Sequence, residues 1–348
     1  MGTPPTTLPA GVRWPLLPRA LPRTVTPIQH ETYGSYLARL AAANTLDLGV
    51  VDALAGYDES DPDCLTRLAA LSALPASVLL RAIPELRHHQ DINTMDLADN
   101  GCPTPQAFIN DIRPACRRCG AVAGAAPGTV SVWATHDRNV CLRHRLWIGA
   151  GVEHPDQQIE LRGLPDIVHA QIRHRRLLRH RGRDETREAF DTAEGWWPNV
   201  TGEPGYTHHR DARLAHAHTT GLDPTGHARA ALEHAVDYPE IVAFTALLAS
   251  PYWRSVLNAR KPTNYQRLHT ELCRRVAAPH YEHANPRLLS FLRRDLENTA
   301  KRRTETDPWP WPARWQHAMA AQIQKEARDQ TRRARRQPDT RRRTQDRR

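Results

Sequence analysis

The chain has almost no lysine, no long apolar run and no segment typical of a secretory signal. Of its 348 residues 48 are basic, yet only Lys261, Lys301 and Lys325 are lysine. This preference for arginine, together with abundant Ala and Pro, indicates codon bias towards GC-rich triplets, so the number of arginines alone does not indicate phosphate binding. No apolar stretch approaches the roughly 18 residues that a membrane span needs, and prolines interrupt residues 1–23. We therefore expect a cytoplasmic protein without a membrane span.

The sequence also lacks the patterns of common catalytic sites. It has no glycine-rich phosphate loop, no acidic triad that spacing would single out, and no paired Ser-His or Cys-His nucleophile. The motif His136-Asp137 and the total of 19 histidines give the only encouragement for a metal-dependent nuclease. We therefore expect that the protein is not an enzyme and that it acts by binding.

Positive charge is concentrated at the C-terminal end. Residues 301–348 hold 15 Lys and Arg against 6 Asp and Glu, while the formal net charge of the whole chain is +10. Beyond Thr331 almost every residue is Arg, Gln, Asp or Thr, which leaves little apolar surface to bury, so we predict a basic and largely disordered tail. A flexible cationic arm gains affinity for DNA by releasing counterions. The candidate DNA-binding residues are Arg332, Arg333, Arg335, Arg336, Arg341, Arg342 and Arg343.

Apolar residues at spacings of three and four predict a mainly α-helical fold. They indicate a helix over residues 31–44 and a pair of helices over 65–83, broken at Leu74-Pro75. The pair resembles a helix-turn-helix, which would contact DNA through Ser77 and Arg81 or else pack as core or dock a protein partner. Further helices are expected over 166–181, which is rich in arginine, and over 224–258, with Pro251 as a breaker.

Two chelating pairs lie between these helical regions. Cys116-Arg117-Arg118-Cys119 and Cys141-Leu142-Arg143-His144 are separated by 21 residues. Each two-residue spacer brings both side chains to one side of a tight turn, and thiolate and imidazole donors suit zinc. The four donors Cys116, Cys119, Cys141 and His144 would close the shell of one structural Zn²⁺. A chance pairing of the two spacings is the alternative, and His136 is either a substitute ligand or a surface or packing residue.

Two features resemble the TniQ family of transposon accessory proteins, over about residues 17–150. The first is the opening helix, which is similar to the family pattern E-S-L-S-S-W-L-x-R-L-A followed by Asn. The second is the C-x-x-C and C-x-x-H finger with Trp133 between its pairs. Three positions depart from the family: Tyr36 stands where Trp is common, Arg145 stands where Gly is frequent, and Arg117 begins a spacer that often starts with Pro. The residues that carry the first feature, with Tyr36 in the place of the Trp, are Glu31, Ser35, Tyr36, Leu37, Arg39, Leu40, Ala41 and Asn44.

The resemblance implies a non-enzymatic adaptor of DNA transposition. Such a protein connects target DNA, or a target-recognising complex, to the AAA+ ATPase and the transposase of the transposon. A zinc-containing transcriptional regulator of a mobile element is the alternative. The expected organisation is a flexible N-terminus (1–16), a TniQ-like domain (17–150) with its zinc finger at 113–150, a helical C-terminal domain (151–300), and a Pro/Trp linker with the basic tail (301–348).

Overall fold

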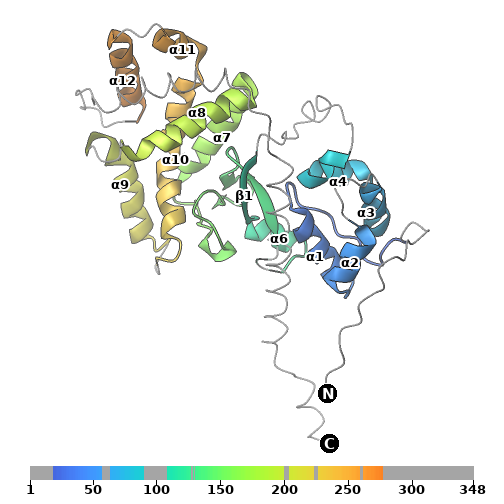
Figure 1. Ribbon diagram of the computed structural model, residues 1–348. Coiled ribbons are helices and arrows are strands. Elements are labelled where there is room, and N and C mark those ends of the chain that lie inside the picture. The colour runs from blue at the N-terminus through green and yellow to red at the C-terminus, as the bar shows by residue number, and fades with distance from the viewer. Residues whose placement is uncertain are drawn as a thin grey trace, which may run out of the picture.

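The protein is mainly helical, with a few short strands between two groups of helices. The computed structural model describes residues 19–56, 63–89, 108–126, 128, 130–199, 204–222, 226–258 and 262–276. Figure 1 places the N-terminal helices α1 to α4 on one side, helices α7 to α12 on the other, and strand β1 with the short helix α6 between them. The mainly α-helical class that the sequence predicted is confirmed.

The N-terminal helices surround one apolar cluster. Helix α1 (Tyr33–Ala43) lies within the predicted range 31–44, and it begins where the Thr32 side chain accepts a hydrogen bond from the Ser35 N–H at 3.2 Å. The apolar stripe of α1 packs against the helices that follow it. These are α2 (Leu48–Ala55), α3 (Cys64–Ser72), α4 (Ala76–Ala82) and the 3₁₀ helix η1 (Pro84–His89).

Helices α3 and α4 form the predicted helix pair. Their axes are bent by 104° at the intervening break, where Ala73 is left-handed with φ of 53° and Pro75 caps α4. Within the described residues no single helix is long and apolar enough to cross a membrane, although α3 and α4 taken together meet the same criteria of length and composition.

A small module of strands and one helical turn follows. Strand β1 (Phe108–Pro114) pairs antiparallel with β2 (Ser131–Thr135), with a register shift between Phe108 and Ile112. Helix α6 (Arg117–Val122) lies between them in sequence, and β3 (Val140–Cys141) pairs antiparallel with β4 (Leu146–Trp147). We call residues 113–150 the metal-binding module, because they contain the four predicted ligands.

The remaining helices are arranged around α10 (Arg229–Leu248), which packs against α7 (Pro165–Arg181), α8 (Arg183–Trp196), α9 (Pro204–Thr219) and α12 (Pro262–Val276). The arginine-rich helix predicted over 166–181 is α7. Pro251 ends one helix and begins the next, α11 (Pro251–Asn258), because proline suits the first helical position. The 3₁₀ turns η3 (Pro155–Gln157) and η4 (Trp197–Asn199) complete the described elements.

The boundary predicted between residues 150 and 151 falls inside a hydrophobic cluster. Val140 and Trp147 of the β3–β4 hairpin are buried in the same cluster as the apolar residues of α7, α8 and α10. Gln171 of α7 is fully buried, and its Oε1 accepts hydrogen bonds from the backbone N–H groups of Asn139 at 2.9 Å and Val140 at 2.8 Å. The second half of the metal-binding module therefore packs as one unit with the C-terminal helices.

Candidate metal centre

The first chelating pair lies at the start of α6. Cys116 is the residue that precedes the helix, and its carbonyl oxygen accepts a hydrogen bond from the Gly120 N–H at 2.9 Å. Because residues three apart in a helical turn lie on one face, Cys116 and Cys119 point the same way. The two-residue spacer that the sequence analysis noted is therefore one turn of a short helix.

The second pair lies on the turn between β3 and β4. The carbonyl oxygen of Cys141 accepts hydrogen bonds from the N–H groups of His144 at 3.2 Å and Arg145 at 2.7 Å. Arg145 is left-handed, with φ of 50°, which closes the turn and returns the chain into β4. This conformation favours glycine, although an arginine occupies it here.

The four side chains converge on one point. Their donor atoms all lie within 4.8 Å of one another. His144 Nδ1 is 3.4 Å from Cys116 Sγ and 3.3 Å from Cys119 Sγ, and the sulfurs of Cys119 and Cys141 are 3.7 Å apart. A tetrahedral site with metal–sulfur bonds of about 2.3 Å has donors roughly 3.6 to 3.8 Å apart. The cluster could therefore hold one metal ion with His144 bound through Nδ1.

The environment also favours a thiolate. A hydrogen bond from Cys116 lowers the pKa of Cys141 to about 4, and the same hydrogen bond, together with burial, raises the pKa of Cys116. Burial, followed by the charge of Cys141, raises the pKa of Cys119. The thiolate is the form of cysteine that binds metals. Leu146 and Ile148 cover the cluster with apolar surface.

Two residues that the sequence analysis missed tie the turns together. Gln158 is buried, and its side chain accepts from the Arg117 N–H at 2.9 Å and donates to the Ala115 carbonyl at 2.8 Å. Glu160 forms a salt bridge with Arg118, and its backbone bridges to Leu146. The segment after the finger thus contacts both chelating pairs. A glutamine without a motif around it gives no signal of this role in the sequence.

His136 is a packing residue and is not part of the cluster. It is 3% exposed, and its ring lies 5.5 Å from that of His174 and 6.0 Å from that of Phe190, measured between centroids. Burial lowers the pKa of His136 to about 4 and that of His174 to about 3, so both rings are neutral at pH 7. The sequence left open whether His136 is a substitute ligand or a surface or packing residue. The structure shows a packing residue, because the ring is buried and lies outside the ligand cluster.

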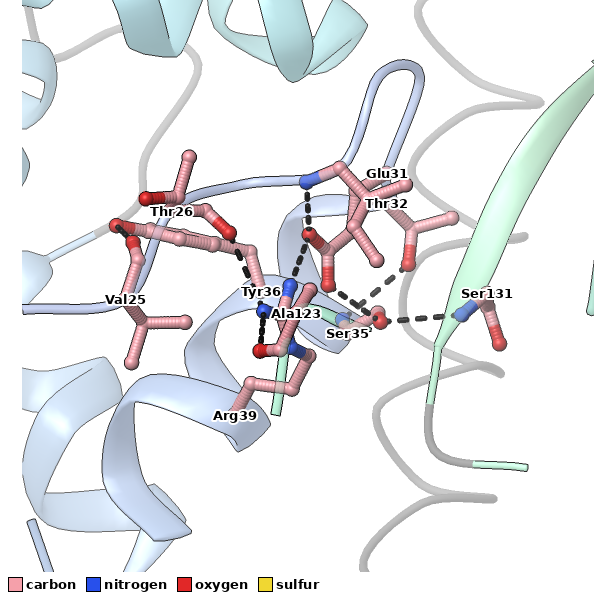
Figure 2. Close-up of polar contacts among 10 residues, drawn as sticks. Val25, Thr26, Glu31, Thr32, Ser35, Tyr36, Arg39, Ala123 and Ser131 are labelled. Carbon is pink, nitrogen blue, oxygen red and sulfur yellow. Dashed lines mark hydrogen bonds and ion pairs between the residues drawn. The ribbon is translucent and has the colours of Figure 1, made fainter. Parts of the chain in front are cut away.

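The opening motif forms a buried polar network around α1. Figure 2 shows Glu31, Ser35 and Arg39 pointing towards one another. Arg39 and Glu31 form an ion pair at 2.7 Å, with side chains only 5% and 0% exposed. Glu31 also accepts hydrogen bonds from the Ser35 hydroxyl at 3.0 Å and the Ile28 N–H at 2.8 Å. The carboxylate is thereby compensated on several sides, as a buried charge requires.

This network reaches the metal-binding module. The Ser35 hydroxyl oxygen accepts a hydrogen bond from the Ser131 N–H of β2 at 3.1 Å, and Arg39 donates to the carbonyl of Ala123, just after α6, at 3.3 Å (Figure 2). The backbone before α1 also pairs with β2, since Glu31 forms an isolated bridge with Val132. The opening motif and the module that carries the four predicted ligands therefore meet in one structural unit.

The other motif residues anchor α1 to its surroundings. The Tyr36 hydroxyl donates to the Val25 carbonyl at 3.0 Å, while Leu37 and Leu40 are buried in the N-terminal cluster. Asn44 ends the helix and exchanges two hydrogen bonds of 2.9 Å with the backbone of Arg23. All these contacts lie within the fold, so the motif residues hold α1 against the segments around it.

Trp133, the tryptophan between the two chelating pairs, has a partner that spacing did not reveal. Its Nε1–H donates to Glu85 Oε1 at 2.5 Å, and the same oxygen accepts from the Tyr33 N–H at 2.9 Å. Glu85 is 1% exposed, and burial raises its pKa to about 7. Glu85 therefore connects η1, α1 and β2.

The remaining predicted binding residues are exposed or lie outside the description. Ser77 and Arg81 are both exposed on α4, one turn apart. Residues 1–16 and 301–348 lie outside the described residues, and so do the candidate DNA-binding residues Arg332, Arg333, Arg335, Arg336, Arg341, Arg342 and Arg343.

Comparisons of the chain with known protein families, with characterised proteins and with solved structures find no match.

Proposed function

We propose that the cluster of Cys116, Cys119, Cys141 and His144 binds one structural Zn²⁺. Three sulfurs and one nitrogen are a donor set typical of structural zinc, and four protein ligands leave no open position for a substrate. When bound, the ion would hold the start of α6 against the β3–β4 turn. The chain's own residues support this role, since Gln158 and Glu160 already connect the same two turns.

The zinc proposal predicts that the protein purified from cells carries about one zinc per chain and that Cys116→Ser releases it. A structural zinc contributes roughly 10 to 16 kcal/mol of apparent binding free energy, so the variant should also lose the folded module. Cys273→Ser is the matched control, because Cys273 lies on α12 away from the cluster. Metal analysis of both variants is the measurement, and wild-type protein without metal would refute the proposal.

We further propose that the protein is a TniQ-type accessory factor of DNA transposition. The observation that carries this proposal is the meeting of two sequence features about 90 residues apart: Ser35 and Arg39 of the opening motif hydrogen-bond to the backbone of the metal-binding module. These contacts support the proposal because they bring the residues of both features into one folded unit.

As such a factor the protein would be an adaptor and not an enzyme. Ser35 and Arg39 hold α1 to β2 and to the end of α6, and the four predicted ligands would close the shell of the metal ion. Its partners would be the AAA+ ATPase and transposase of the element, together with target DNA or a target-recognising complex. Strand transfer would take place in those partners.

The deciding experiment is co-purification of the full chain with an AAA+ ATPase encoded beside its gene, with and without DNA. We expect association that is lost in Cys116→Ser and retained in Cys273→Ser. Failure of the wild-type chain to associate under either condition would contradict the adaptor function.

The bend of 104° between α3 and α4 favours one alternative, a zinc-containing transcriptional regulator. Helices joined at about 90 to 120° are typical of the DNA-binding helix-turn-helix, and Ser77 and Arg81 are exposed on the second helix. A regulator should bind its own DNA site at about 10⁻⁸ M or tighter and be indifferent to the ATPase. The adaptor proposal instead expects association with the ATPase and no tight binding of the chain alone to a specific DNA site.

A further inference from the structure

A basic pocket lies between the two groups of helices. Its volume is about 560 Å³, within the range of roughly 300 to 1,000 Å³ that is common for binding pockets. Four parts of the chain form its walls: the turn before α1, the end of β2 with the turn after it, Leu142 of the β3–β4 turn, and the face of α7 with the start of α8. The charged residues of the wall are Asp137, Arg138, Arg175, Arg179 and Arg183.

The wall carries more positive than negative charge. Asp137 is its one carboxylate, and it lies 3.6 Å from Arg183. Arg138 donates a hydrogen bond to the Gln29 carbonyl oxygen at 3.0 Å. This uncharged partner fixes the position of the guanidinium group but does not neutralise its charge. Within the described part of the chain, Arg175 and Arg179 form no salt bridge and no side-chain hydrogen bond. Three guanidinium groups therefore share a concave surface without an ion-pair partner there.

The guanidinium groups of the pocket repel one another. Burial lowers the pKa of Arg138, the neighbouring charge of Arg175 lowers it further, and the charges of Cys141, Cys119 and Asp137 oppose this shift. An anion between these groups would relieve their repulsion, and guanidinium groups match the oxygens of a phosphate especially well. The evidence for an anion-binding site is where these arginines lie, because the large number of arginines in the chain reflects codon usage.

The shape of the surface favours a chain of phosphates over a single one. Arg175 and Arg179 are both exposed and lie one turn apart on α7, about 6 Å along the helix axis. Arg173 and Arg176 are also exposed on α7, but they do not line the pocket. Of the two acidic residues in the first turn of α8, Asp184 and Glu185, the second is paired with Arg254 of α11 at 3.1 Å.

We propose that this pocket binds backbone phosphates of a nucleic-acid strand, through the guanidinium groups of Arg138, Arg175 and Arg179. The proposal deepens the adaptor function, on which its biological meaning rests, by giving the chain a phosphodiester-binding site in its folded body. Asp137 holds Arg183 at the rim of this site. Contacts to phosphates carry no base preference, so binding here is independent of sequence.

The test is the salt dependence of binding between the full chain and a labelled 30-base-pair duplex of arbitrary sequence, followed by fluorescence anisotropy. Each lost phosphate contact reduces the slope of log affinity against log salt by about 0.9. The double variant Arg175→Gln/Arg179→Gln should therefore flatten the slope by about 2. The charge-conserving variant Arg175→Lys/Arg179→Lys should retain most of it.

Arg173→Gln/Arg176→Gln is the matched control, since it removes the same charge from the same helix outside the pocket. A smaller change in this control supports a pocket, whereas equal changes in both double variants, or none in the pocket variant, overturn the proposal. Titration with AMP tests a free nucleotide as the ligand. AMP binding that the pocket variant abolishes, with an unchanged duplex slope, would also overturn it. Association with the ATPase, measured without DNA, reports separately on the adaptor function.

Discussion

Arg145 occupies a backbone conformation that an L-amino acid with a side chain adopts at a cost. Its φ is 50°, while its N–H and C=O groups are both used, in hydrogen bonds to Cys141 and from Leu161. The exposed side chain has no part in these backbone bonds. We therefore predict that Arg145→Gly stabilises the protein by about 1 kcal/mol, measured as a rise in the thermal midpoint of the zinc-loaded chain.

Arg143→Gly is the control for that prediction, because Arg143 is exposed on the same turn and does not have a positive φ. There glycine gains nothing in the folded state and loses more conformational entropy on folding, so the midpoint should fall. A fall in both variants would contradict the account of the turn.

At the same scale, the buried His136 makes stability depend on pH. Its pKa is about 4 in the folded chain, against 6.5 for a free histidine, so the unfolded chain binds its proton first as the pH falls. Stability is therefore lost from about pH 6.5 downwards. Asp137 opposes the shift, and Arg187 and Arg183 reinforce it. We predict that His136→Leu removes a penalty of about 2 kcal/mol at pH 5 and almost none at pH 8.

Urea denaturation at the two pH values measures this difference. The exposed His208 on α9 provides the control, because His208→Asn removes a histidine that the core does not surround. The pH dependence of the control should match that of the wild type. An equal effect of His136→Leu at pH 5 and pH 8 would show that its burial affects packing alone.

At the scale of elements, the Glu31–Arg39 pair joins α1 to the metal-binding module. Removing one partner leaves an uncompensated buried charge, which costs about 3 to 5 kcal/mol. We predict a loss of this size for Arg39→Met, and recovery of most of it in Glu31→Gln/Arg39→Met, from equilibrium denaturation. The exposed Arg229–Glu233 pair, 3.0 Å apart, is the control, and Arg229→Met should cost less than about 1 kcal/mol. Equal losses in the single and double motif variants would contradict the ion-pair account.

Sequence patterns predict local structure here better than they predict the contacts between distant segments. The periodicity of Tyr33, Tyr36 and Leu40 indicated α1, and the spacing of the chelating pairs indicated four donors that do converge. The hydrogen bond between Ser35 and Ser131 spans 96 residues, and no local rule marks either partner. The role of Gln158 could not be predicted for the same reason, because a single buried amide that bridges two turns produces no periodic pattern in the sequence.

At the scale of the whole molecule, the described residues form separate apolar clusters connected by polar contacts. The N-terminal cluster contains the apolar faces of α1 to α4, whereas the C-terminal cluster contains those of α7 to α10 and α12 together with Val140 and Trp147. The Trp147 ring contacts that of Tyr238 edge to face, with centroids 5.3 Å apart. The β3–β4 hairpin thus packs with the C-terminal helices, and the hydrogen bonds from the backbone of Asn139 and Val140 to Gln171 strengthen that connection.

If the four predicted ligands bind the proposed zinc, this division predicts where the effects of removing it spread. A chelator should raise amide hydrogen exchange first at the ligand turns, and next in β3, β4 and the middle of α7, because Gln171 holds the hairpin to that helix. Helices α3 and α4 belong to the other cluster and should keep their protection. In Gln171→Met the chelator should have a smaller effect on α7. Equal loss of protection in α3 and α7 would mean that the metal stabilises both clusters alike, and the hairpin would then not be the route by which its effect travels.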